Sequence, residues 1–232
     1  MKYSLITFDV GGVLMRMDRE RVAREYVALA KSRGAVLDMD ATLSTVTALD
    51  NEIPARAKNS PSLSLSERVG ENFWKTLYRD GWTRLGLTQD ADAIDHFYRL
   101  FRRGDFNCLF DDVRPALDDL TRRGLTLGIV SNFTPNLELV LRELGIAKYF
   151  SVVAVSAVVR VEKPDRAIFD HAARAAKCAG KEIAHVGDGV HADVEGARNA
   201  GWDAILLDRD NWYPDYSAAP RIRTLGELVN WL

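Results

Sequence analysis

The stretch Ser4–Leu14, with the sequence SLITFDVGGVL, decides the fold of this chain. Residues 5–8 are apolar and favour extended structure, which predicts a buried strand near the start of the chain. Asp9 ends that run, and we expect the two glycines that follow Val10 to form a tight turn. Open α/β sheets bind ligands at the carboxyl ends of their strands. Asp9 is therefore a candidate nucleophile or metal ligand, although an aspartate after a strand also often caps a helix.

Length and composition are those of an ordinary globular enzyme. The chain has 232 residues, of which 47% are hydrophobic, enough for one large domain or two small ones. Its formal net charge of −2 gives no electrostatic reason to expect nucleic acid or an anionic membrane as a partner. The N-terminal apolar run is too short for a signal peptide, and no run reaches the roughly 20 residues of a membrane span. We expect a cytoplasmic monomer or homodimer.

Helical patterns dominate residues 16–105. Asp18 is placed to cap a first helix that ends near Gly34. The polar stretch that follows, from Pro54 through Ser66, is expected to be a loop. Apolar and aromatic residues at spacings of three and four then predict two further helices, over residues 66–85 and 90–101. We expect no strand in this block, and we interpret its aromatic residues as core packing.

From Asp111 onward, strands alternate with helices. Such alternation, with each strand nearly all apolar, predicts an α/β fold with a Rossmann-like parallel sheet and helices on both faces. The domain prediction is a core made of residues 1–15 and 106–232, with an all-helical domain of residues 16–105 inserted. The strands are expected at 125–130, 152–155, 183–186 and 204–207, and the helices at 113–123, 135–144, 165–177, 194–200 and 225–232.

Two further strand ends carry polar side chains. Ser131 and Asn132 follow the strand at 125–130, so they are predicted at the same sheet edge as Asp9. Ser131 is suited to donate to a phosphoryl oxygen, or else to cap the next helix. Lys163 precedes Pro164, which restricts it to extended backbone and sits well in the first turn of a helix. That geometry would direct the lysine inward, whereas most lysines are simply solvated.

An acidic pair follows the strand at 183–186. Asp188 lies in a glycine-containing loop, and Asp193 opens the next helix. Two carboxylates across one loop can share a hard cation such as Mg²⁺, which prefers oxygen ligands. Asp193 also has the simpler interpretation of a helix cap.

The order of these residues resembles that of the haloacid dehalogenase-like (HAD) hydrolase superfamily. The resemblance covers the whole predicted core, and the helical insert is similar to the cap of the subfamily that contains phosphoglycolate-phosphatase-like and dehalogenase-like enzymes. Four motifs carry it: Phe8–Leu14, Val130–Asn132, Glu162–Pro164, and Gly187–Asp188 with Asp193.

The resemblance implies a phosphatase that acts on a small phosphorylated metabolite. Asp9 would attack phosphorus and form an aspartyl-phosphate. Mg²⁺ would be held by Asp9, the carbonyl of Gly11 and Asp188, with Asp193 in support. Ser131, Asn132 and Lys163 would bind the substrate, with Lys163 supplying positive charge. The helical cap would close over the leaving group.

One position departs from the family pattern. Most family phosphatases carry a second aspartate two residues after the nucleophile, where it protonates the leaving group, but here that residue is Gly11. Losing a general acid typically costs about 10²–10⁴ in rate. The interpretations left open are a phosphatase for good leaving groups or with a substitute acid (His191 or Asp18), a metal-independent 2-haloacid dehalogenase, a non-catalytic binding or regulatory protein, and another HAD chemistry such as a mutase.

Overall fold

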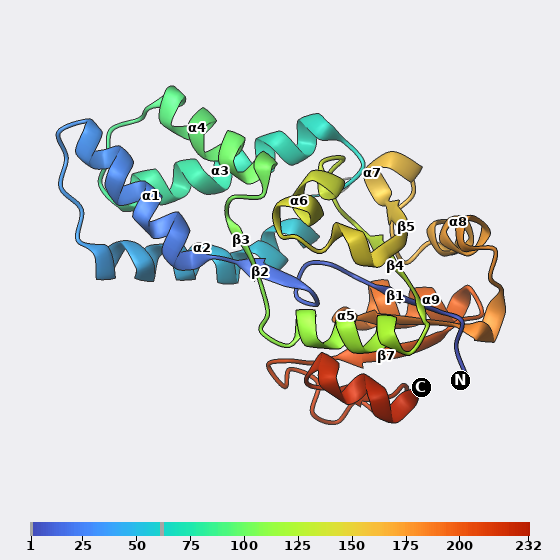
Figure 1. Cartoon of the computed structure of the whole chain (residues 1–232). Coiled ribbons are helices and arrows are strands. Elements are labelled where there is room, and N and C mark those ends of the chain that lie inside the picture. The colour runs from blue at the N-terminus through green and yellow to red at the C-terminus, as the bar shows by residue number, and fades with distance from the viewer. Residues whose placement is uncertain (1, 61–62) are drawn as a thin grey trace. The chain divides into compact units, whose positions relative to one another are not determined.

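The computed structural model describes residues 2–60 and 63–232 and divides into two compact units (Figure 1). The core unit consists of Met1–Arg16 and Leu109–Leu232, and the helical unit is Met17–Cys108. The short strands β2 (Met15–Met17) and β3 (Asn107–Leu109) form a small sheet of their own. The expectation of no strand in residues 16–105 was therefore wrong at Arg16 and Met17, and β3 was not predicted.

The core unit contains a six-stranded sheet, which confirms the predicted fold class. The recorded pairings along the order β5-β4-β1-β6-β7-β8 are all parallel. The predicted strands all form, with ends shifted by a residue or two, while β8 was not predicted. The strands are β1 (Leu5–Phe8), β4 (Thr126–Ser131), β5 (Phe150–Val155), β6 (Ile183–Gly187), β7 (Asp203–Leu207) and β8 (Arg221–Ile222).

The strand order fixes where a ligand can bind. From β1 the chain proceeds to β4 and β5 on one side, then returns to place β6 against the other side of β1. The carboxyl ends of β1 and β6 therefore flank the point where the winding direction reverses, which is the usual ligand site in open α/β sheets.

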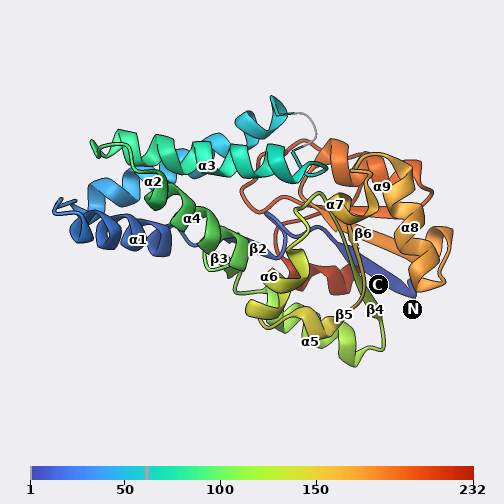
Figure 2. The ribbon, with the colours of Figure 1, turned by 90° about the horizontal axis from the view of Figure 1, so that it is seen from above.

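Helices cover both faces of this sheet. Figure 2 shows α5 on one face and α8 with α9 on the other. Two predictions needed correction: residues 194–200 begin inside a π-helical turn, and residues 225–231 are 3₁₀ rather than α-helical, while α7 was missed. The elements are α5 (Val113–Arg122), α6 (Leu137–Glu143), η1 (Ala147–Tyr149), α7 (Ser156–Val159), α8 (Arg166–Ala176), η2 (Gly180–Glu182), the π-helical turn η3 (Val190–Glu195), α9 (Gly196–Asn199) and η4 (Leu225–Trp231).

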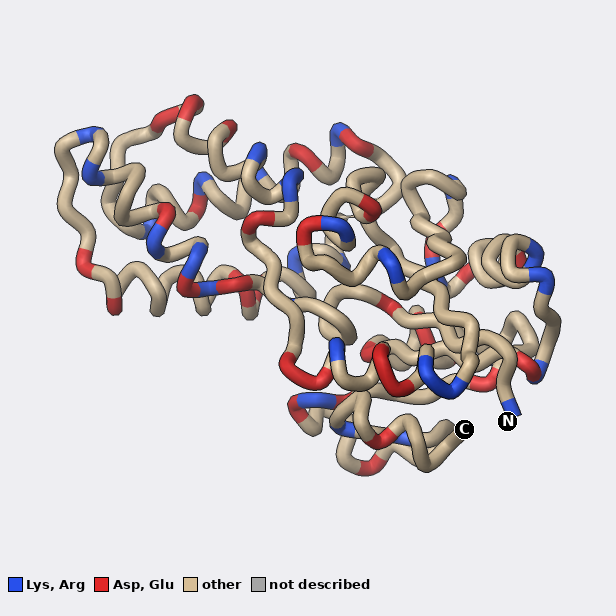
Figure 3. The backbone as a smooth tube through the Cα atoms, viewed as in Figure 1, with Lys and Arg blue, Asp and Glu red and all other residues tan. Residues whose placement is uncertain are grey.

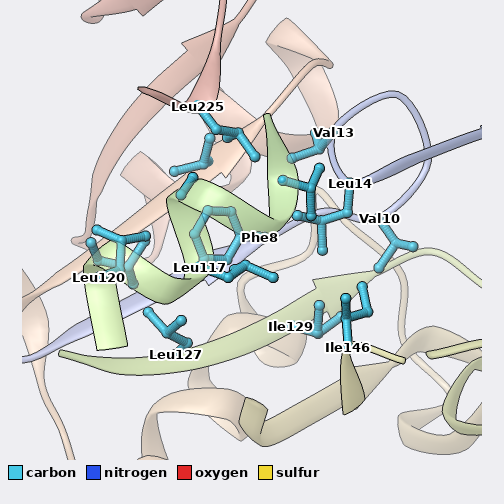
Figure 4. Close-up of a cluster of buried hydrophobic side chains, with 14 of the residues drawn as sticks. Phe8, Val10, Val13, Leu14, Leu117, Leu120, Leu127, Ile129, Ile146 and Leu225 are labelled. Atoms are coloured by element: carbon cyan, nitrogen blue, oxygen red, sulfur yellow. The ribbon is translucent and has the colours of Figure 1, made fainter. Parts of the chain in front are cut away.

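Alternating side chains of β1 enter separate hydrophobic clusters. Ile6 and Phe8 pack into the cluster that includes α5, α6 and η4, part of which is drawn in Figure 4. Leu5 packs into the cluster built with α8 and α9. Asp9 therefore directly follows a strand whose four residues are all buried.

The described residues of the helical unit form four α-helices: α1 (Arg19–Ser32), α2 (Met39–Lys58), α3 (Glu67–Arg84) and α4 (Ala91–Arg103). Asp18, Ser66 and Asp90 cap α1, α3 and α4 as their positions predict. The aromatic residues of these helices pack together, and the Tyr26 and Phe97 ring centroids are 4.2 Å apart. Core packing was therefore the correct interpretation of these aromatic residues.

Helix α2 was not predicted. Only Thr42, Val46 and Leu49 of its 20 residues are buried, so its sequence shows little helical periodicity. Pro54, taken as a loop marker, lies inside the helix, whose start is capped by Asp38. The loop prediction was thus wrong up to Lys58, and its part at residues 61–62 lies outside the described residues.

A candidate active site at the carboxyl edge of the sheet

Asp9 is held at the end of β1 by the loop that follows it. Its backbone N–H donates to the carbonyl of Val186 on β6, at 2.9 Å. The carbonyl of Val10 accepts from the N–H groups of both Leu14 and Met15, which closes the loop on itself. The Asp9 side chain remains 16% exposed, so it is reachable although its strand is buried.

The two glycines of this loop differ in what they require. Gly12 has φ of +72°, and a Cβ there would collide with the carboxylate of Asp188. Gly11 lies outside the left-handed region, and a Cβ on it would meet no described atom within 4 Å. The tight turn was expected to need both glycines, but the backbone needs only Gly12.

Lys163 lies buried between two carboxylates. Its Nζ is 2.9 Å from Oδ1 of Asp9 and 2.5 Å from Oδ1 of Asp193, and its side chain is 2% exposed. Burial alone would lower the pKa of Lys163, but the negative charges of Asp193 and Asp9 outweigh burial and raise it to about 12. The ammonium group therefore stays charged beside Asp9.

Asn132 binds the backbone of Lys163 from both sides. Its Oδ1 accepts from the Lys163 N–H at 2.7 Å, and its Nδ2 donates to the Lys163 carbonyl at 3.0 Å. The side-chain amide thus fixes the segment that carries the lysine. Ser131 is buried at the end of β4, next to this contact.

Asp193 is the centre of a buried network. Its Oδ1 contacts both Lys163 and Nε2 of His185, and its Oδ2 accepts from the N–H of Gly189. Burial favours the neutral acid, but Lys163 and His185 outweigh it and hold the pKa of Asp193 well below its usual range. With both oxygens engaged, Asp193 anchors the lysine, and its support of a metal stays a prediction.

His185 lies behind this network and was not predicted as part of the site. Burial lowers its pKa in spite of the nearby Asp193. A neutral ring that donates from Nε2 to Asp193 accepts at Nδ1 from the hydroxyl of Thr7, 2.9 Å away. His185 alternates with Ala184 and Val186 along β6, which resembled ordinary strand packing in the sequence.

The donor set fits a divalent cation. Asp9, Asp188 and Asp193 each offer an oxygen within 4.8 Å of the others. Oδ1 of Asp9 is buried and receives no hydrogen bond of good geometry from any described residue, although Lys163 lies nearby. Burial and the charges of Asp9 and Asp193 raise the pKa of Asp188 to about 8. Lys163 does not balance three carboxylates, so this acidic cluster (Asp9, Asp188, Asp193 and Lys163) suits an added hard cation.

A second pair of charges, which we call the arginine clamp, holds the other end of the loop formed by residues 9–14. Arg209 donates to the carbonyls of Gly12 (3.3 Å) and Val13 (2.8 Å) and binds both carboxylate oxygens of Asp112. Its guanidinium also lies 4.0 Å from the ring centroid of Phe110. The clamp was missed, although Asp208-Arg209 directly after β7 gave a signal: charged residues at another strand end.

The sequence profile of the haloacid dehalogenase-like hydrolases matches residues 3–201 of this chain. The chain belongs to this family. Haloacid dehalogenase-like hydrolase domain-containing protein 3 of Xenopus laevis is 30% identical over 211 residues, covering 89% of this chain and 85% of that protein. A phosphoserine phosphatase of Thermus thermophilus is 38% identical over 176 residues, covering 73% of this chain and 68% of the phosphatase.

A solved HAD structure shows the same fold. L-2-haloacid dehalogenase from Xanthobacter autotrophicus superposes with a TM-score of 0.70 at 18% identity, covering 98% of each chain. The HAD fold of this chain therefore occurs in enzymes named as phosphatases and in enzymes named as dehalogenases. The choice between these chemistries has to come from the site itself.

The distribution of charge and hydropathy outside the site gives no further evidence about the function. Figure 3 shows acidic and basic residues interspersed along both units. Among the described helices, none combines the length and the apolar character needed to span a bilayer.

Proposed function

We propose that this HAD hydrolase is a Mg²⁺-dependent phosphatase that acts on a small phosphorylated metabolite through an aspartyl-phosphate on Asp9. One observation carries the proposal: three carboxylates lie within 4.8 Å of one another, and among the described residues the buried lysine beside them pairs only with Asp9 and Asp193. Excess negative charge at a strand edge can bind a divalent cation, and the cation can in turn bind a phosphoryl group. We expect a cytoplasmic protein, monomeric or homodimeric, with neither nucleic acid nor membrane as partner.

The reaction follows from the placement of these residues. A carboxylate oxygen of Asp9 attacks phosphorus, the P–O bond to the leaving group breaks, and its electron pair leaves with that oxygen. Lys163, held by Asn132 and Asp193, keeps its positive charge beside the attacking carboxylate. Ser131 would donate to a phosphoryl oxygen. Mg²⁺, when bound by Asp9, Asp188 and the Gly11 carbonyl, offsets the repulsion between carboxylate and phosphate.

Water completes the cycle. It attacks phosphorus of the aspartyl-phosphate, the bond to the Asp9 oxygen breaks, and phosphate departs. The fixed loop between Val10 and Met15 returns the carboxylate to the same position for the next substrate.

The dehalogenase alternative fits the site less well. A halide leaves as an anion, and the acidic cluster would repel it unless a cation were present. A reaction that needs no metal also gives no reason to place Asp188 where burial and two acidic neighbours raise its pKa.

The test is hydrolysis of p-nitrophenyl phosphate and acetyl phosphate, with Mg²⁺ and with EDTA. We expect Mg²⁺-dependent phosphate release that Asp9→Asn removes. Asp170→Asn, a surface aspartate paired only with Arg166 in the described contacts, is the matched control and should retain activity. Equal rates in Asp9→Asn and wild type would refute the nucleophile. Chloride release from 2-chloropropionate without metal would identify a dehalogenase, and Mg²⁺ binding without turnover of any substrate a binding protein.

A further inference from the structure

Position 11 has room for an acid that the chain does not carry. A Cβ on Gly11 would meet no described atom within 4 Å, and its φ lies outside the left-handed region. The neighbouring Gly12 differs on both counts, because its φ is +72° and a Cβ would strike Asp188. Glycine at position 11 is therefore not imposed by the fold, and its effect on the reaction can be considered separately from its effect on the backbone.

The two substitutes that the sequence offered have other contacts. His191 is 78% exposed, and its Nδ1 lies 2.8 Å from Oε2 of Glu195, one turn along η3. Asp18 accepts from the N–H of Arg21 as the cap of α1, and it belongs to the helical unit. Of the groups next to Asp9, Lys163 is held between two carboxylates, and Asp188 would be a ligand of Mg²⁺. Each group thus has a structural role that its use as a proton donor would disturb.

The missing acid matters in proportion to the basicity of the leaving group. When Asp9 attacks, the electron pair of the breaking P–O bond remains on the leaving oxygen. An alkoxide needs a proton as it departs, whereas a carboxylate, whose acid has a pKa of about 4, departs unprotonated. A phenolate, with an acid of pKa about 10, lies between the two. A positioned general acid is worth about 10²–10⁴ in rate, and that gain is lost where the leaving group needs it most.

We infer that Gly11 restricts this enzyme to phosphoryl donors whose leaving group departs without a proton, such as acyl phosphates and activated aryl or enol phosphates. The inference rests on the proposed phosphatase function and specifies its substrate class. It makes Gly11 a specificity-determining residue: the open space beside the nucleophile accepts a substrate but supplies no proton to it.

The experiment measures kcat/KM with Mg²⁺ for acetyl phosphate, a series of substituted phenyl phosphates and a simple alkyl phosphate. The ratio kcat/KM reports the formation of the aspartyl-phosphate, so slow hydrolysis of that intermediate does not mask the leaving group. We expect log kcat/KM of the wild type to fall steeply as the leaving-group pKa rises.

Two substitutions at position 11 separate proton donation from occupied space. Gly11→Asp should raise kcat/KM for the alkyl phosphate by about 10²-fold and flatten the dependence, while acetyl phosphate changes little. Gly11→Asn fills the same space without an acidic proton and should keep the wild-type slope. Thermal unfolding and Mg²⁺ titration of both variants check that each folds and binds the cation.

The outcomes are distinct. A flat wild-type dependence, with alkyl phosphates hydrolysed as fast as aryl phosphates, overturns the inference while leaving the phosphatase intact. A steep wild-type slope that Gly11→Asp leaves unchanged overturns the assignment to Gly11. Absence of Asp9-dependent hydrolysis of every substrate overturns the proposed function, and the inference with it. The wild-type slope is decisive even if a variant fails to fold.

Discussion

Two groups of partly or fully buried charges lie at the same edge of the sheet, and they differ in how well their charges are paired. In the arginine clamp, Arg209 faces Asp112, each carboxylate oxygen has a donor, and the spare donors bind the Gly12 and Val13 carbonyls. In the acidic cluster, three carboxylates accompany one lysine, which pairs with Asp9 and Asp193 but not with Asp188. The first group is balanced, whereas the second is left with unsatisfied negative charge.

The loop formed by residues 9–14 connects these two groups. Its first residue, Asp9, belongs to the acidic cluster, and its carbonyls at Gly12 and Val13 are held by the clamp. A buried group without partners costs free energy and relaxes unless the surroundings hold it. We conclude that the balanced clamp is structural, and that it allows the unbalanced cluster to keep its geometry for a ligand.

The largest expected effect comes from breaking the balanced group. Arg209→Met leaves the partly buried Asp112 without its cation and two backbone carbonyls without this donor, so we expect a loss of about 3 kcal/mol, at the lower end of the range for buried ion pairs. Urea unfolding measures the change. Arg166→Met removes an exposed arginine from a surface pair with Asp170 and should cost less than about 1 kcal/mol. If the two variants unfold at the same urea concentration, the clamp is not structural.

Removing a carboxyl group from the acidic cluster should raise the stability of the protein, whereas breaking the arginine clamp lowers it. Burial and two neighbouring carboxylates disfavour the ionised form of Asp188, whose pKa is raised to about 8. Asp188→Asn should therefore stabilise the metal-free protein at pH 7 by about 2–3 kcal/mol, since each pKa unit corresponds to about 1.4 kcal/mol and the amide regains only part of it. Excess Mg²⁺ should then stabilise the wild type much more than the variant.

The matched variant for this comparison is Asp193→Asn. Asp193 is in the same cluster, but its oxygens accept from Lys163, His185 and Gly189, so its removal should destabilise. Thermal unfolding in EDTA compares the two. Destabilisation by both substitutions would show that the acidic cluster does not carry excess negative charge.

The sequence predicted the parts of this arrangement that local pattern determines. Apolar runs such as Leu5–Phe8 located the strands, and the polar residue after each strand gave Asp9, Ser131 and Asp188. Helix α2 was missed because only three of its residues are buried, too few to produce a visible periodicity.

Other features depend on tertiary contacts that no local pattern records. Arg209 and Asp112 are 97 residues apart, so their pairing follows only from the order of strands and helices. Gly11 and Gly12 are the same residue type in the sequence. They differ only in φ and in the closeness of Asp188, and both quantities are set once the chain has folded.

The smallest expected effect concerns Asp208, a balanced carboxylate directly after β7. It accepts from the N–H groups of Trp212 and Tyr213 and from Arg221. Burial would raise the pKa of Asp208, but these donors outweigh burial and lower it. Asp208→Asn should lower the free energy of unfolding by about 1–2 kcal/mol at pH 7, because the amide nitrogen of Asn cannot accept a hydrogen bond where a carboxylate oxygen did.

The pH dependence of this difference follows from the direction of the shift. An acid whose pKa is lower in the folded state stabilises the fold above its unfolded pKa of about 3.9, and it loses that contribution as pH falls further, through the folded value. The stability gap between wild type and Asp208→Asn should thus be constant from pH 7 to about pH 5 and shrink below about pH 4. Urea unfolding at each pH measures the gap. A gap that widens on acidification would mean that the pKa of Asp208 is raised in the folded state, like that of Asp188. The number of donors around a carboxylate would then not distinguish the clamp type of site from the acidic cluster.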